Sequence, residues 1–172
     1  ISGSVTYPGL SNAIFHWLAE NEPDRIDKAR WSLTCNGWLF AKLTGLFFSD
    51  LSDGSNPFSN ITAAAYSPDI LRLYGLEDRA HLLPPIRGGA DLVSSLTTAA
   101  AEQVGLPIGT PIIMAPYDIV TTAYGCGCAS TGQACVILGT TICTEVITSS
   151  LNLEASPSGT TIALGNGSFR SE

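Results

Sequence analysis

The hydrophobic pattern of the chain changes near residue 130, and this change constrains the fold more than any other feature. Upstream, residues 11–22 and 67–75 each begin with a serine that can cap a helix. Downstream, residues 133–139 and 142–149 are rich in β-branched side chains and are joined by a tight turn. The pattern predicts an α/β chain with a mainly helical first part and a β-rich end.

The β-rich end is short, and a unit of about 40 residues buries too little apolar surface to be stable alone. We therefore expect residues 1–130 to be the later part of one domain and residues 131–172 the beginning of a second. The boundary is expected near Ser130–Gly132. The sequence does not start with methionine, which favours a chain that begins inside a larger protein.

Local signals place further elements along the chain. Capping and stop residues predict additional helices, an apolar run predicts a buried strand, and a stretch dense in Ser, Asp, Asn and Gly predicts a polar loop. The expected helices are 11–22, 36–45, 67–75, 91–105 and 118–127, the strands are 31–35, 111–116, 133–139, 142–149 and 160–165, and the loop is 47–60.

The composition indicates a chain with a sizeable core, since 45% of its residues are hydrophobic and 13% are charged. A net charge of −7 argues against binding to a nucleic-acid backbone. No run reaches the roughly 18 apolar residues of a membrane helix, and five cysteines with apolar neighbours suit reduced thiols in the cytoplasm. A bound phosphate would be held by backbone N–H groups and hydroxyls rather than by a lysine cluster.

Two groups of residues raise the question of a metal site. The cysteines within 126–143 include a C-x-C pair, but zinc sites favour C-x-x-C spacing, so small core residues are the preferred interpretation. The serines and aspartates within 49–53 could also bind a metal. We favour residues that cap their own turn, because short polar side chains readily bond to nearby backbone groups.

Asp118 is the most informative single residue, because it follows the apolar segment "PIIMAP" and precedes small residues and glycines. One interpretation is a helix N-cap, which accepts backbone N–H bonds. The other is a catalytic carboxylate, since the carboxyl ends of strands in α/β folds face ligand-binding crevices. Such a group can accept the proton of an attacking hydroxyl during phosphoryl transfer.

The segment "ILGTTICTEV" predicts a hairpin with Gly139, Thr140 and Thr141 at its turn. An ordinary hairpin explains this pattern by itself. A second interpretation is a phosphate cradle, because glycine lets a ligand approach the backbone and the threonines add hydroxyl donors.

Taken together, the segments resemble the middle of a sugar kinase of the FGGY carbohydrate kinase family. "YPGLSNAIFHWLAENEPDRIDKARW" resembles the family's Trp-Leu helix followed by "ENEP". "NGWLFAKLTG" and "SDLSDGSNPF" resemble its "D-W-L-…-L-T-G" helix and its "S/T-D-x-S-x-A-S" loop. "YGLED…LLPPI", "AAAEQVGLPIGTPIIMAPYDIVTTAYGCG" and "ILGTTICTEV" follow in the family's order, so the resemblance covers nearly the whole chain.

The resemblance implies an actin-like, ribonuclease-H-like ATPase fold in which sugar and ATP meet between two domains. It implies that Asp118 is the catalytic base, that Gly139, Thr140 and Thr141 belong to a phosphate loop, and that ATP and Mg²⁺ take part. The implied partners are small molecules, a sugar and ATP, and a homodimer is one assembly that the resemblance allows. Within the family, the chain looks most similar to kinases of L-xylulose and related keto-sugars.

Several departures from the family pattern leave alternatives open. The family's N-terminal "D-x-G-T" turn and its later glycine-rich segment are absent, Ile14 replaces a frequent lysine, and Gly54 replaces a usual alanine. The first two absences indicate a fragment. The alternative function is an actin-like protein that binds or hydrolyses ATP without phosphorylating a sugar, and a non-enzymatic β-rich interaction module is a further rival.

Overall fold

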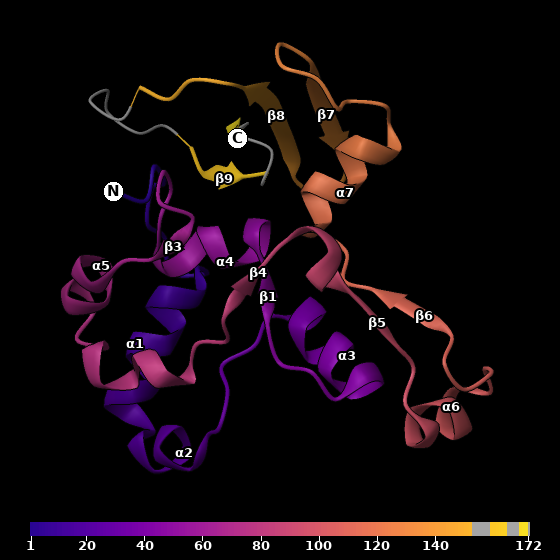
Figure 1. Cartoon of the computed structure of the whole chain (residues 1–172). Coiled ribbons are helices and arrows are strands. Elements are labelled where there is room, and N and C mark those ends of the chain that lie inside the picture. Colours follow the sequence, from indigo (N-terminus) through magenta and orange to yellow (C-terminus); the bar gives the residue numbers. More distant parts are fainter. Residues whose placement is uncertain (153–158, 165–168, 172) are drawn as a thin grey trace.

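A computed structural model describes residues 1–152, 159–164 and 169–171 of the chain (Figure 1). The turn expected after the last strand, at residues 165–167, lies outside these residues. Helices and strands alternate irregularly up to α7, and strands predominate after it. No helix within the described ranges is long and apolar enough to cross a membrane.

The helices and strands within those residues have the following bounds. The α-helices are α1 (Ser11–Asn21), α2 (Pro23–Lys28), α3 (Cys35–Thr44), α4 (Leu51–Phe58), α5 (Pro68–Leu73), α6 (Thr98–Val104) and α7 (Asp118–Gly125), and the 3₁₀ helices are η1 (Glu77–Leu82) and η2 (Gly89–Leu92). The strands are β1 (Ser49–Asp50), β2 (Ser59–Asn60), β3 (Ala65–Tyr66), β4 (Ile86–Arg87), β5 (Val93–Ser95), β6 (Pro111–Ile113), β7 (Ala134–Leu138), β8 (Ile142–Thr148), β9 (Thr161–Ala163) and β10 (Phe169–Ser171).

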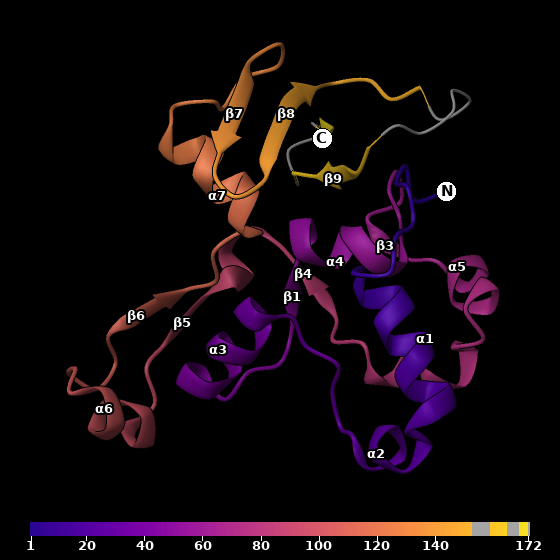
Figure 2. The ribbon, with the colours of Figure 1, turned by 180° about the vertical axis from the view of Figure 1, so that it is seen from behind.

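The strands form one larger sheet and three short pairs. The larger sheet has the order β7-β8-β10-β9, and each of its neighbouring pairs is antiparallel. β1 pairs with β4 in parallel, whereas the pairs β2–β3 and β5–β6 are antiparallel. The pair β5–β6 and α6 form an arm that extends away from the remaining helices (Figures 1 and 2).

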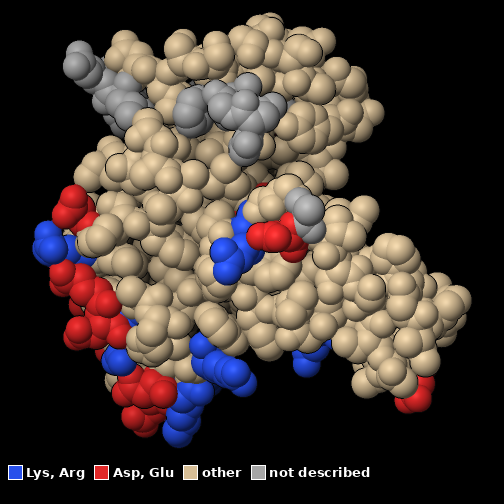
Figure 3. Space-filling model, in the orientation of Figure 1, with Lys and Arg blue, Asp and Glu red and all other residues tan. Residues whose placement is uncertain are grey.

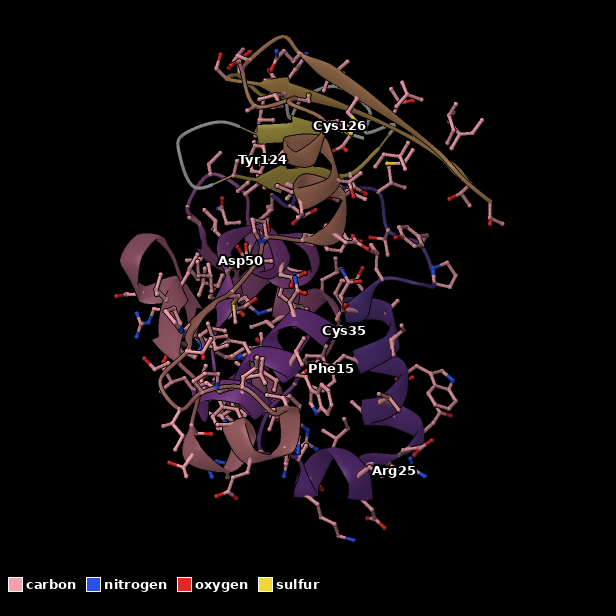
Figure 4. All side chains as sticks on the ribbon, turned by 90° about the vertical axis from the view of Figure 1, so that its right-hand side faces the viewer. Phe15, Arg25, Cys35, Asp50, Tyr124 and Cys126 are labelled. Atoms are coloured by element: carbon pink, nitrogen blue, oxygen red, sulfur yellow. The ribbon has the colours of Figure 1, made fainter. Side chains whose placement is uncertain are left out.

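The helical part has its own apolar core, which holds α1, α2, α4 and α5 together. Phe15 of α1 meets Phe58 of α4 edge to face, with ring centroids 6.1 Å apart, a favoured geometry for aromatic pairs. Figure 4 shows the Phe15 side chain directed from α1 into this core. The buried members are Phe15, Ile26, Phe58, Ile70, Leu71, Leu76 and Leu82.

The polar stretch 47–60 contains a helix, so the expectation of a loop is wrong. Asp50 is the N-cap of α4, and its carboxylate accepts the N–H groups of Ser52 and Asp53. The hydroxyls of Ser55 and Ser59 donate to backbone carbonyls of the same segment. Because the serines satisfy their hydrogen bonds within the turn, this polar sequence forms a buried helix.

The expected helix 91–105 is correct only in its second half. Thr97 caps α6 by accepting the Ala100 N–H, whereas Val93 lies in β5 and pairs with Ile113 of β6. That pairing is a tertiary contact, which overrides the weak helical preference of the local sequence. The strand expected at 111–116 is shorter than predicted, since β6 ends at Ile113. It is also less buried than predicted, since Ile113 is 69% exposed in this chain.

The expected strand 31–35 is also wrong, because Trp31–Thr34 lie in no regular element and Cys35 begins α3. Thr34 is the N-cap of α3, and its hydroxyl accepts the Gly37 N–H. The capping threonine therefore starts a helix at the point where the β-branched pattern indicated a strand end.

Gly54 leaves room for Ile86, and this contact gives a test of the packing of α4 on β4. A Cβ atom at position 54 would lie 2.7 Å from Ile86 Cγ1 and 2.9 Å from Ile86 Cδ1. Alanine is favoured over glycine in a helix by about 1 kcal/mol, but overpacking costs about 1–3 kcal/mol. We expect Gly54→Ala to lower the free energy of unfolding by about 1 kcal/mol, measured by chemical denaturation.

The matched comparison is the same change in an Ile86→Ala background, where both crowded atoms are absent. There Gly54→Ala should raise the stability, because only the gain in helix propensity remains. An equal loss in both backgrounds would show that the contact with Ile86 is not the cause.

Two further clusters fix the position of α7. Ala123 of α7 is fully buried against Cys128, Cys135 and Ile147, which ties the helix to the larger sheet. Met114, just before α7, packs on Phe40 and Phe48 beside α3. The first residue of α7 therefore lies where the helical part and the larger sheet meet (Figure 1).

Candidate active site at the start of helix α7

Asp118 is the first residue of α7 and its side chain is exposed. Its Oδ1 accepts the N–H of Ile119 at 2.8 Å. The N-cap position belongs to Tyr117, which makes no side-chain capping bond. Asp118 therefore satisfies one first-turn N–H from inside the helix, and the strict N-cap interpretation is wrong.

A second carboxylate, Asp53 of α4, lies near Asp118. The pKa of Asp53 is raised to about 6, chiefly by burial. A hydrogen bond from the Thr34 hydroxyl (2.9 Å) acts in the opposite direction, and the negative charge of Asp50 contributes to the rise. A hydrogen bond with Asn36 also lowers this pKa, and the charge of Asp118 raises it. The start of α7 and the first turns of α3 and α4 therefore form one electrostatically coupled site.

The raised pKa makes the stability of the fold depend on pH. The unfolded carboxyl has a pKa of about 3.9, so the unfolded chain loses the Asp53 proton first as the pH rises. Stability from this group is therefore highest at low pH and decreases through the window from about pH 4 to 6. We expect Asp53→Asn to abolish that decrease and to be more stable than wild type at pH 7 by about 2–3 kcal/mol.

The measurement is the free energy of unfolding across this pH window, with the exposed Asp91 as a control. Asp91→Asn should follow the wild-type curve. If the free energy of unfolding changed with pH in the same way for Asp53→Asn and wild type, a raised pKa of Asp53 would be contradicted.

The capping interpretation of residues 49–53 is confirmed. The Asp50 carboxylate accepts the Ser52 N–H at 2.8 Å, the Ser52 hydroxyl at 2.5 Å and the Asp53 N–H at 3.3 Å. Among the residues that the structure describes, no group of three His, Cys, Asp or Glu side chains is arranged to hold a metal ion. The Asp50 carboxylate is used by three donors of its own turn.

The expected hairpin is confirmed, with Leu138 of β7 paired to Ile142 of β8. In its turn the Gly139 N–H donates to the Thr141 carbonyl at 3.0 Å. Gly139, Thr140 and Thr141 are all exposed, and the described residues provide no acceptor for the N–H groups of the two threonines. These N–H groups and the two hydroxyls are the type of donors that a phosphate requires.

The turn lies at the end of the hairpin nearer the helical part of the chain (Figures 1 and 2). Within the described ranges no hydrogen bond or ion pair joins it to Asp118, and a common cleft stays a prediction. No lysine or arginine occurs between Arg87 and Arg170. On the face that Figure 3 shows, the exposed charged side chains lie away from β7 and β8. A phosphate at this turn would therefore depend on backbone and hydroxyl donors.

One cavity borders α7, and a second lies within the helical part, between α3 and α4. One of about 520 Å³ is lined by residues that include Ser52, Pro116 and Tyr124, and a smaller one of about 60 Å³ is lined in part by Thr34 and Asp53. Neither lining includes Asp118. Asp118 is exposed, and the expectation that its side chain opens into a cleft stays a prediction.

The sequence did not point to Asn36, and it raised Ser52 only as one member of a possible metal site within residues 49–53. The Asn36 Nδ2 donates to the carbonyls of Ala115 (3.3 Å) and Pro116 (3.2 Å), and the Ser52 Oγ accepts the Tyr117 N–H at 2.8 Å. Both side chains thus hold the backbone immediately before Asp118. For both residues the sequence shows only a polar side chain in the first turn of a helix. Such a position does not reveal which distant residue the side chain contacts.

Comparison with known proteins places this site in a family. Residues 1–125 match the model of the N-terminal domain of the FGGY family of carbohydrate kinases. The chain is 36% identical to the erythritol kinase of Brucella abortus over 121 residues, which are 69% of this chain and 23% of that protein. It is 29% identical to the L-xylulose/3-keto-L-gulonate kinase of Escherichia coli over 152 residues, which are 88% of this chain and 30% of that protein.

The fold is also shared with solved structures. A xylulose kinase from Brucella ovis superposes with a TM-score of 0.84 at 23% identity, over 99% of this chain and 35% of that one. The expected actin-like sugar-kinase fold is thereby confirmed. Because the family model matches most of the residues of the chain, the chain belongs to the FGGY family of carbohydrate kinases.

Proposed function

We propose that the protein containing this chain transfers the γ-phosphate of ATP to a hydroxyl of a sugar or polyol, with Asp118 as general base, in the cytoplasm. The observation that carries the proposal is an exposed carboxylate at the first turn of α7, in a chain of the carbohydrate kinase family. The chain spans 23% to 30% of the length of the two curated relatives described above. Its activity is therefore a property of the protein that contains it.

In this mechanism Asp118 accepts the proton of the acceptor hydroxyl. Its Oδ1 is engaged by the Ile119 N–H, and the exposed side chain leaves the carboxylate accessible to a substrate. The deprotonated oxygen forms a bond to the γ-phosphorus as the bond to the β-phosphate oxygen of ATP breaks, and ADP leaves. Asp118 then releases its proton to water, which restores the base.

The turn Gly139–Thr141 binds the ATP phosphates in this proposal. Its threonine N–H groups and hydroxyls, which have no hydrogen-bond partner among the described residues, would donate to the phosphate oxygens. The exposed glycine leaves the backbone open to a ligand. Mg²⁺ arrives with ATP as part of the substrate, since phosphate oxygens are favoured ligands of this ion. We also propose that the second domain begins near Ser130–Gly132.

The acceptor is proposed to be a ketopentose or a related keto-sugar or polyol. One relative is named an erythritol kinase and another an L-xylulose/3-keto-L-gulonate kinase. The names of related proteins thus include both a polyol and keto-sugars as acceptors. The alternative function is ATP binding or hydrolysis without a sugar acceptor. The family membership favours the kinase.

The test is an acceptor panel with the protein expressed from its complete reading frame. Erythritol, L-xylulose and 3-keto-L-gulonate would be supplied with MgATP, and formation of the phosphorylated product followed by mass spectrometry. We expect saturable phosphorylation of at least one member. ATP hydrolysis that is equally fast with and without every acceptor would favour the alternative.

A further inference from the structure

The exposed Asp118 has little contact of its own to hold it in place. Its described side-chain hydrogen bond is with Ile119, the next residue in the chain, and such a local bond moves with the helix. The orientation of the carboxylate must therefore be set by the backbone that leads into α7. That backbone, residues 115–117, is bound by side chains from α3 and α4.

The first of these bonds comes from a buried chain of hydrogen bonds in α4. The Ser52 hydroxyl donates to Asp50 Oδ2 at 2.5 Å and accepts the Tyr117 N–H at 2.8 Å. Ser52 is 3% exposed and Asp50 is 4% exposed. A hydroxyl that donates to a buried carboxylate has a fixed orientation, so its lone pair is held toward Tyr117.

The other bonds come from α3, where the Asn36 side chain donates to the carbonyls of both Ala115 and Pro116. Thr121 of α7 also donates to the Pro116 carbonyl, at 2.9 Å. Thr121 also donates to the Tyr117 carbonyl, through its hydroxyl at 3.2 Å and its N–H at 3.0 Å. The segment is therefore bound at an N–H by α4, at two carbonyls by α3, and at two carbonyls by Thr121 of α7. Figure 4 shows Asp50 at the level where α7 meets the helical part.

This arrangement matters because general-base catalysis depends on position. A displacement of about 1 Å in a catalytic group can cost about 100-fold in rate. Loss of either bond would leave the fold of α7 intact, since Ala123 anchors that helix on the larger sheet. The loss would instead loosen the few residues that connect α7 to α3 and α4.

We propose that Ser52 and Asn36 are positioning residues that hold residues 115–117 and thereby direct the Asp118 carboxylate toward the acceptor hydroxyl. This inference rests on the proposed role of Asp118. It gives a reason for the serine two residues after the capping aspartate in the "SDLSDGS" segment. That serine joins the cap of α4 to the entry of α7.

The experiment measures Ser52→Ala and Asn36→Ala in wild-type and Asp118→Asn backgrounds, using the best acceptor of the panel above and the protein from the complete reading frame. In the wild-type background each change should lower kcat by about 10- to 100-fold. The KM for ATP should stay within about twofold. In the Asp118→Asn background neither change should lower kcat further, because the group that they position no longer acts.

The matched control is Ser67→Ala. Ser67 is also a buried serine and caps α5 by accepting the Ile70 N–H, away from residues 115–117. It should lose about 1 kcal/mol of stability with kcat unchanged. Ser52→Thr, which keeps the hydroxyl, should retain more activity than Ser52→Ala.

The outcomes separate this inference from the proposed function. Full kcat in both single variants, with Asp118→Asn inactive, overturns the positioning role alone. Equal losses in both backgrounds also overturn it, since they indicate a general loss of folded protein. Should Ser52→Ala fail to fold, the half-buried Asn36 decides the question by the same comparison. Near-normal activity of Asp118→Asn would overturn both the assignment of Asp118 as the base and the positioning role of Ser52 and Asn36.

Discussion

Asp118→Asn is expected to lower the turnover number for sugar phosphorylation by about 10²–10⁴-fold, the usual contribution of a general base. Asparagine keeps the size of the side chain, and its carbonyl can still accept the Ile119 N–H. It cannot accept the proton of the acceptor hydroxyl. The KM for ATP should change little, because the carboxylate acts on the acceptor rather than on the nucleotide.

Two further variants serve as comparisons. Asp118→Ala should be at least as damaging and should also lose about 1 kcal/mol of stability with the first-turn hydrogen bond. Asp91→Asn, at an exposed acid in η2, should be nearly silent. If Asp118→Asn kept more than about a third of wild-type turnover, the carboxylate would be assigned to helix stability alone.

Gly139→Val is expected to raise the KM for ATP by about 10- to 100-fold, equivalent to one lost hydrogen bond to a charged group. The backbone of Gly139 is not in the left-handed region, and an added Cβ would meet only the Thr141 carbonyl oxygen, at 3.7 Å. The turn itself therefore tolerates a side chain. The added atoms would occupy the space that the phosphates need.

The control for this variant is Gly88→Val, since an added Cβ at that exposed glycine meets no atom within 4 Å. It should leave the KM for ATP unchanged. Thermal unfolding of Gly139→Val should match wild type. An unchanged KM in the folded variant would show that the β7–β8 turn is an ordinary hairpin.

Elements with local signals could be predicted from the sequence. Helix α5 has a serine cap, a proline in its first turn and a glycine after its end, and all three signals act within the segment. The β7–β8 hairpin likewise follows from two β-branched runs and a short turn.

Other elements depend on contacts that a single segment does not reveal. The serines of 47–60 read as a loop, but in α4 they bond to the helix backbone and to the N–H of Ala163, a residue more than a hundred positions away. Residues 93–95 read as the start of a helix, but they pair with β6. In β5 a tertiary contact overrode the local preference, whereas in α4 bonds within the segment act together with one distant partner.

The same limit applies to the candidate site. Asp118 could be found because an acid after an apolar run and before small residues is a local pattern. The contacts of Asn36 and Ser52 with residues 115–117 could not be found, since these bonds reach residues 65 to 80 positions along the chain. The candidate base was thus accessible from the sequence, whereas the side chains that bond to the backbone before it required the fold.

The most direct test of a sugar kinase is whether ADP formation depends on a sugar or polyol. The protein from the complete reading frame would be incubated with MgATP, with and without the best acceptor, and ADP and phosphorylated product quantified together. A kinase should form both products in equal amounts, with little ADP when the acceptor is omitted. ADP and inorganic phosphate at the same rate without any acceptor would contradict the kinase and indicate an ATPase of the same fold.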